Sequence, residues 1–214
     1  MTILISAAPG SASNTLKKTL EKYYNTKSKV LACDQGIGHL NLRINARDII
    51  LKKLKIYNLI NKDKILYGHV FPTTFNLDLL NKYFFIDQII VTYRNIFDQL
   101  NYIYKWKKLR KRTPLGFANY NGNVTDTDID LDIILMLNFY KQWFIYSKRK
   151  KVQFLSYKEI TNDRSEILFN KKYIKIKKSN VFKKVNFKIK KKHYQIVKNF
   201  LKENSKIDFS LITN

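Results

Sequence analysis

The sequence opens with Thr2-Ile-Leu-Ile-Ser6, continues through Ala8-Pro-Gly-Ser-Ala-Ser-Asn-Thr15 and then enters Leu16-Lys-Lys-Thr-Leu20. The first segment is an apolar run typical of a buried strand, the second is a loop of small residues, and the third begins a helical pattern. This order suits a phosphate, because a small-residue loop lets the backbone approach an anion and a helix N-terminus directs N–H groups at it. The pattern therefore predicts an anion site in the loop.

Strands and helices alternate beyond this opening. Short apolar runs predict strands at residues 2–6, 29–33, 64–69, 87–93 and 152–156. Amphipathic or dipole-matched patterns predict helices at residues 13–24, 46–59, 77–83 (with Asn76 as its cap), 96–108, 126–150 and 190–202. Such alternation is typical of βαβ units. We predict one α/β domain over residues 1–214, with a three-layer, P-loop-like fold and a central parallel sheet flanked by helices.

The composition is strongly basic, with 41 Lys and Arg against 16 Asp and Glu and a net charge of +25. Such a field attracts nucleotides, phosphorylated or sulfated substrates, nucleic acid and acidic membranes. The single cysteine, Cys33, excludes an intrachain disulfide, and the scattered residues His39, His69 and His193 do not suggest a metal site. An apolar strand that begins at Thr2 leaves no room for a signal peptide, and no apolar run is long enough for a membrane span, so we expect a cytoplasmic protein.

Three positions could carry chemistry at the carboxyl ends of the strands, where ligands bind in parallel sheets. The loop at residues 8–15 lacks the lysine of a Walker A motif, so hydrolysis of ATP or GTP is not expected. Arg94 follows the strand at residues 87–93 and could hold a phosphate, because a guanidinium forms bidentate hydrogen bonds with phosphate oxygens. His69 stands at the end of the predicted strand at residues 64–69 and could act as a general base.

Taken together, the chain resembles the sulfotransferase superfamily that uses 3′-phosphoadenosine 5′-phosphosulfate (PAPS), especially its small bacterial members. Four segments carry the resemblance: Pro9-Gly-Ser-Ala-Ser-Asn-Thr15, Tyr67-Gly-His-Val-Phe-Pro72, Ile90-Val-Thr-Tyr-Arg-Asn-Ile-Phe-Asp98 and Val152-Gln-Phe-Leu-Ser-Tyr-Lys-Glu-Ile160. They resemble the family's phosphosulfate loop, catalytic-base segment, 3′-phosphate segment and Leu-x-Tyr-Glu-Asp-Leu segment. The resemblance runs from residue 1 to about residue 163.

The resemblance implies transfer of a sulfuryl group to a hydroxyl or amine, with His69 as the catalytic base and 3′-phosphoadenosine 5′-phosphate as the product. It implies no metal. The residues that it assigns to the cofactor are Pro9, Gly10, Ser11, Ala12, Ser13, Asn14, Thr15, Arg94 (on the 3′-phosphate), Tyr102, Tyr157 (near the adenine), Lys177 and Lys178.

The chain departs from the family at several of these positions. Gly10 stands where the family has a basic residue, Ala12 replaces a glycine, Asn14 replaces a threonine, and Tyr102 stands where a serine is expected. Lys17, Lys18 or a lysine of the tail would have to supply the missing cation. The family's Arg-Lys-Gly loop has two candidate counterparts, Lys177-Lys178-Ser179 and Phe169-Asn170-Lys171, in a basic tail at residues 171–192 that could close over the nucleotide.

The acceptor is expected at a loop over residues 110–125. Its basic and aromatic residues, Arg110, Arg112, Phe117 and Tyr120, suit an anionic glycan, although a small molecule also fits. Two other functions stay open. The missing basic residue at position 10 favours a P-loop nucleotide-binding or kinase-like protein, or a non-catalytic relative of the sulfotransferases. The lysine-rich tail with interleaved aromatic residues favours a basic nucleic-acid-binding protein.

Overall fold

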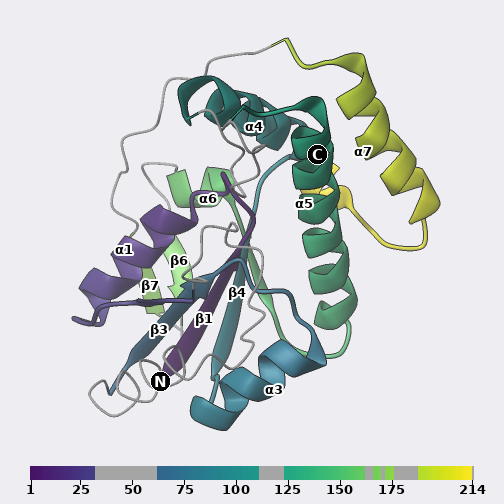
Figure 1. Ribbon diagram of the computed structural model, residues 1–214. Helices are drawn as coiled ribbons and strands as arrows, with labels where there is room; N and C mark the ends of the chain where they lie inside the picture. The colour runs from purple at the N-terminus through teal and green to yellow at the C-terminus, as the bar shows by residue number, and fades with distance from the viewer. Residues whose placement is uncertain (32–61, 111–122, 162–165, 170–171, 176–187, 214) are drawn as a thin grey trace.

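A five-stranded parallel sheet forms the centre of the computed structural model, which describes residues 1–31, 62–110, 123–161, 166–169, 172–175 and 188–213 (Figure 1). The strand order is β2-β3-β1-β4-β5. The strands are β1 (Thr2–Ala7), β2 (Lys29–Val30), β3 (Lys64–Gly68), β4 (Gln88–Tyr93) and β5 (Gln153–Ser156).

Strand β1 lies in the middle of the sheet and is buried along its whole length. Its Leu4 pairs with Leu66 of β3 on one side and with Ile89 of β4 on the other. The continuous apolar run of this strand has a physical reason, because a central parallel strand is covered on both faces. The chain leaves the carboxyl end of β1 between two strands whose connections run in opposite directions, which is the position where parallel sheets bind ligands.

Helices cover both faces of the sheet. They are α1 (Ser13–Tyr23), α3 (Thr74–Tyr83), α4 (Ile96–Arg110), α5 (Asp126–Ser147), α6 (Tyr157–Thr161), α7 (Lys191–Glu203) and α8 (Ser210–Thr213). Figure 1 shows α1, α6 and a two-stranded hairpin, β6 (Glu166–Phe169) and β7 (Lys172–Lys175), on one side, and α5 and α7 on the other. Three layers of this kind confirm the predicted α/β fold.

The side chains of β1 alternate between two cores. Ile3 and Ile5 pack with Leu16 and Leu20 of α1. Leu4 packs in the second core, which holds the buried aromatic residues of α5. In that core Trp143 is completely buried and its Nε1 donates a hydrogen bond of 2.9 Å to the carbonyl oxygen of Val70. The alternation follows from the two-residue period of a strand.

The predicted elements are confirmed within a few residues, with two corrections. Helix α3 begins at Thr74 and its cap is Thr73, whose Oγ1 accepts a hydrogen bond from the Asn76 N–H, so the predicted Asn76 cap is wrong. The extended backbone of Thr73 lets its hydroxyl reach the first turn, which a residue inside the helix cannot do. Helix α5 ends at Ser147 rather than at residue 150, where a run of like charges follows.

Two predicted segments, the helix at residues 46–59 and most of the loop at residues 110–125, lie outside the described residues. None of the helices that the structure describes combines the length and the apolar character that crossing a membrane requires.

Candidate phosphate-binding site

The loop between β1 and α1 turns sharply, with two residues in the left-handed region of backbone space. Gly10 has φ +81° and Ala12 has φ 62° and ψ 16°. Glycine adopts this conformation readily, whereas for alanine it costs roughly 1–2 kcal/mol. Strained non-glycine residues concentrate at functional sites, because strain persists only where the surroundings hold it in place. The loop is therefore a candidate site on its backbone geometry as well as on its sequence.

Buried side chains of β4 and α4 form hydrogen bonds with this loop. The Ser11 hydroxyl donates a hydrogen bond of 2.6 Å to the carbonyl oxygen of Ala8 and also lies 2.6 Å from Oγ1 of Thr92. Because a hydroxyl has one proton, Thr92 must be the donor to Ser11. The Gln99 side chain donates a hydrogen bond of 2.8 Å to the carbonyl oxygen of Pro9. Ser11, Thr92 and Gln99 are all completely buried, so these bonds attach the loop to β4 and α4.

Another buried residue, Tyr140, holds the side chain of Gln99 in place. The Tyr140 hydroxyl of α5 donates a hydrogen bond of 3.0 Å to Oε1 of Gln99 and accepts one from the backbone N–H of Arg94. Burial raises the pKa of Tyr140 well above its ordinary value, so the hydroxyl stays a neutral donor at physiological pH. The amide of Gln99 therefore has a partner at each end, and its orientation is fixed.

The N–H groups of the loop stay available. The first helical hydrogen bonds of α1 run from the N–H groups of Thr15 and Leu16 to the carbonyl oxygen of Ala12. Among the described residues, no hydrogen bond engages the N–H groups of residues 10–14. Consecutive free N–H groups at the positive end of a helix dipole form an anion site.

Arg94, directly after β4, lies against this loop. Its Nη1 is 3.5 Å from the carbonyl oxygen of Gly10, its Nε is 3.5 Å from a carboxylate oxygen of Asp98, and its guanidinium carbon is 4.1 Å from the centre of the Tyr157 ring. The side chain is 18% exposed, so the guanidinium is largely shielded but still reachable by a ligand. The structure therefore brings together Arg94, Tyr157 and the loop, which the sequence had placed on one edge.

His69 lies at the same edge, because Gly68 of β3 pairs with Ser6 of β1. Its Nδ1 is hydrogen-bonded to the carbonyl oxygen of Ala7. A carbonyl oxygen only accepts, so Nδ1 carries the proton and Nε2 is the basic nitrogen of the neutral ring. This tautomer is the one that a general base acting through Nε2 requires.

Tyr102 explains why position 10 is a glycine. A Cβ atom built on Gly10 would lie 2.8 Å from two atoms of the Tyr102 ring, closer than real Cβ contacts. The ring therefore covers the bare face of Gly10, and a larger residue does not fit there without moving Tyr102. The two departures from the family pattern at positions 10 and 102 are thus one packing feature.

Lys17 of α1 is one of the proposed replacement cations, and its side chain is half-buried. Its ammonium lies 5.4 Å from the centre of the Tyr67 ring, and the Tyr67 hydroxyl is 3.1 Å from Oγ of Ser13 in the loop. Lys18 is exposed on the other side of the helix turn. Arg94 therefore contacts the loop directly, at Gly10. Lys17 is connected to the loop through the Tyr67 ring, whose hydroxyl contacts Ser13.

The chain matches no protein-family model and no curated protein. A function must therefore be argued from the arrangement of these side chains and from the motifs that the sequence carries.

Several predicted site residues lie outside the described part of the chain. They are Arg112, Phe117, Tyr120, Lys177 and Lys178, and the same holds for the side chain of Arg110 at the end of α4. The predicted acceptor loop and the predicted closing tail thus stay predictions.

Sequence reasoning missed a second polar cluster, between α4, α5 and α7. The completely buried His193 has its Nδ1 2.5 Å from the Tyr104 hydroxyl and its Nε2 3.0 Å from a carboxylate oxygen of Asp130. Burial lowers the pKa of His193, although Asp130 opposes the shift. None of the loop residues takes part in these contacts, so the cluster joins helices rather than extending the candidate site. The one sequence signal for this cluster is that His193 lies on the same face of α7 as the buried Val197.

Proposed function

We propose that this protein is a PAPS-dependent sulfotransferase that transfers a sulfuryl group to a hydroxyl or amine acceptor, with a carbohydrate as the favoured class. The observation that carries the proposal is the meeting of three parts at one edge of the sheet. Arg94 contacts Gly10, His69 contacts Ala7, and both lie beside a loop with free N–H groups. The motif resemblance assigns separate roles in sulfuryl transfer to these same parts.

The donor set fits the nucleotide. PAPS would supply an activated sulfuryl group attached to the 5′-phosphate of a 3′-phosphorylated adenosine. The N–H groups of residues 10–14 would bind the 5′-phosphate, and Arg94 would bind the 3′-phosphate through paired hydrogen bonds. The ring of Tyr157, which already stacks on Arg94, offers a face for the adenine.

His69 would act on the acceptor. Its Nε2 would accept the proton of the attacking hydroxyl or amine, while the Nδ1 hydrogen bond to Ala7 keeps the ring oriented. The loop N–H groups would stabilise the negative charge that gathers on the leaving phosphate, since fixed donors need no reorganisation during the reaction. Arg94 and Lys17 are the candidates for the cation that the family places at position 10.

The packing of Tyr102 on Gly10 supports a second candidate function, the binding of a phosphorylated nucleotide without transfer. A protein of this kind would keep the N–H groups and Arg94 and would not need a cation beside the sulfuryl group. Turnover separates the two candidates.

Calorimetric titration with 3′-phosphoadenosine 5′-phosphate and with adenosine 5′-phosphate tests the nucleotide site. The 3′-phosphorylated nucleotide should bind more tightly than adenosine 5′-phosphate. Arg94→Ala should weaken its binding about 100-fold, as expected for loss of a charged, bidentate hydrogen-bonded pair. Arg149→Ala removes the same charge from an exposed position and should leave the affinity unchanged. Equal binding of both nucleotides would remove the basis for the proposal.

Transfer assays with PAPS and a panel of glycan and phenol acceptors test the chemistry. His69→Ala should abolish transfer while nucleotide affinity is kept. Tight binding without any transfer by the unmodified protein would favour the non-catalytic candidate. Binding of DNA alone, with a steep dependence on salt, would instead favour a nucleic-acid-binding protein.

A further inference from the structure

The lysines around α7 fall into two sets. Lys190 lies 2.6 Å from a carboxylate oxygen of Asp126, and Lys192 lies 3.0 Å from one of Asp130, so these two are neutralised by α5. The other five are exposed and form no ion pair with any described residue. We call them the α7 lysine stripe: Lys188, Lys191, Lys198, Lys202 and Lys206.

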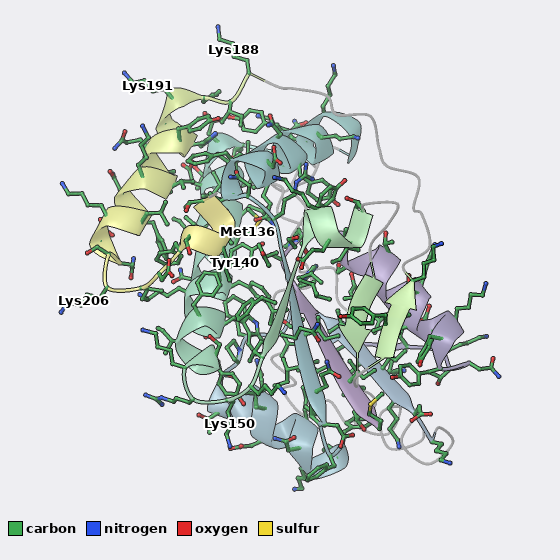
Figure 2. The ribbon with its side chains drawn as sticks, turned by 180° about the vertical axis from the view of Figure 1, so that it is seen from behind. Met136, Tyr140, Lys150, Lys188, Lys191 and Lys206 are labelled. Atoms are coloured by element: carbon green, nitrogen blue, oxygen red, sulfur yellow. The ribbon has the colours of Figure 1, made fainter. Side chains whose placement is uncertain are left out.

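The three stripe lysines within α7 itself lie in a straight row. At 3.6 residues per turn, Lys191, Lys198 and Lys202 lie within about 20° of one line along the helix, and they span about 16 Å. They stand opposite the buried residues His193 and Val197. Figure 2 shows Lys188, Lys191 and Lys206 along the outer edge of this part of the molecule, with their side chains directed away from it.

Within the part of the chain that the structure describes, no ion pair compensates the charge of this row. Glu203 is the only acidic residue between positions 188 and 206. Lysines on neighbouring turns repel one another, so a row of them opposes compact packing unless an anion lies across it. A partner with charges distributed along a chain would relieve this repulsion at several positions at once.

We infer that the α7 lysine stripe binds an extended anionic polysaccharide. The choice of a glycan rests on the proposed function. Gln195 lies beside the stripe on the same face and is hydrogen-bonded to Asn199 at 2.7 Å, so amide groups that can bind sugar hydroxyls alternate with the charges. Lysine suits carboxylates and sulfates of irregular spacing, because it is a point charge on a flexible stem.

The surface fits other polyanions less well. Surface helices that bind membranes insert apolar residues, whereas Ile196, Phe200 and Leu201 of α7 pack against the core. Single-stranded nucleic acid stacks on exposed aromatic rings. Tyr194 is 36% exposed, but its ring is already stacked on Phe97, with ring centres 5.0 Å apart. Neither class finds on the described face of α7 the contacts that it normally uses.

The test compares two variants with the same loss of charge. One is Lys191→Gln/Lys198→Gln/Lys202→Gln, and its control is Lys22→Gln/Lys82→Gln/Lys150→Gln, which changes three exposed lysines elsewhere. The probes are heparin, a DNA duplex with the same number of charges, uncharged dextran and phosphatidylserine vesicles, each at low and high salt. We expect heparin to bind more tightly than the other probes, with the stripe variant at least 10-fold weaker and the control within about 3-fold.

Equal weakening in both variants would overturn the inference, because net charge alone would then explain binding. Stripe-dependent binding of DNA or vesicles as tight as that of heparin would also overturn it, in favour of a nucleic acid or a membrane. Titration of both variants with 3′-phosphoadenosine 5′-phosphate keeps the proposed function separate, since neither should change that affinity.

Discussion

The loop after β1 and helix α7 are both polar regions, but they are held in opposite ways. Neutral hydroxyl and amide groups anchor the loop, and Ser11, Thr92 and Gln99 are completely buried there. Around α7, ion pairs at the surface join Lys190 and Lys192 to α5. Seven lysines lie between residues 188 and 206, in or beside α7, whereas residues 8–15 form the candidate anion site without a single charged side chain.

The comparison shows that net charge and anion recognition are separate properties. A charged surface attracts many anions and is screened by salt within about 10 Å at 0.1 M ionic strength. Fixed N–H groups recognise one anion at one position, because buried bonds set their directions before the ligand arrives.

Gln99→Leu should strongly destabilise the protein. It leaves the carbonyl oxygen of Pro9 and the hydroxyl of Tyr140 without their partner in the core, which should lower the free energy of unfolding by about 2–4 kcal/mol. Urea denaturation measures the loss. Gln195→Leu on the surface of α7 is the control and should change stability by less than about 0.5 kcal/mol. Similar values for the two variants would mean that Gln99 does not anchor the loop.

Gly10→Ala should have the next largest effect. The new methyl group meets the Tyr102 ring and the residue must keep φ +81°, so we expect a loss of about 1–3 kcal/mol. A double-mutant cycle with Tyr102→Ala isolates the contact, because the second change removes the ring. The summed losses in free energy of unfolding of the two single variants should therefore exceed the loss of the double variant. Simple additivity would show that the ring does not limit position 10.

His193 should make the α7 region sensitive to acid. Its pKa is lowered by burial below that of the unfolded chain, despite Asp130 and Asp126, while Lys192 and Lys190 reinforce the shift. The unfolded state therefore binds the proton more readily, and the stability that His193 contributes is present above about pH 6.5 and lost as pH falls below it. Denaturation midpoints at pH 7.5 and 5.5 should differ less in His193→Gln than in the unmodified protein. An unchanged difference would assign the acid sensitivity to other groups.

Asp126→Asn should have the smallest effect. The carboxylate pairs with Lys190, and this hydrogen bond lowers the pKa of Asp126, but the pair is exposed. We expect a loss of at most about 1 kcal/mol that shrinks in 1 M salt, as for other surface ion pairs. A larger loss that salt does not reduce would show that Asp126 does more than form a surface ion pair with Lys190.

The sequence predicted those features of the site that depend on neighbouring residues. A strand, a turn of small residues and a helix are local patterns, and parallel strands end at one edge, so the meeting of the first loop with Arg94 and His69 could be expected. The loop N–H groups follow from the helix start in the same way.

The sequence could not predict contacts between distant segments. Gln99 and Pro9 are 90 positions apart, and Tyr104 and His193 are 89 positions apart. Their contacts depend on the rotation of α4 about its axis, because Tyr102 faces the loop while Tyr104 faces α7. No periodicity within one segment fixes that rotation, so the packing of Tyr102 on Gly10 and the buried partners of His193 appear only in the folded structure.

We propose that the first loop, and not the basic surface of α7, recognises the nucleotide. A ¹H–¹⁵N NMR titration with 3′-phosphoadenosine 5′-phosphate tests it directly, because each backbone N–H reports separately. We predict that the signals of residues 10–14 and of the Arg94 side chain shift during the titration, while those of α7 stay in place. Shifts that gather on α7 and spare the loop would contradict the account.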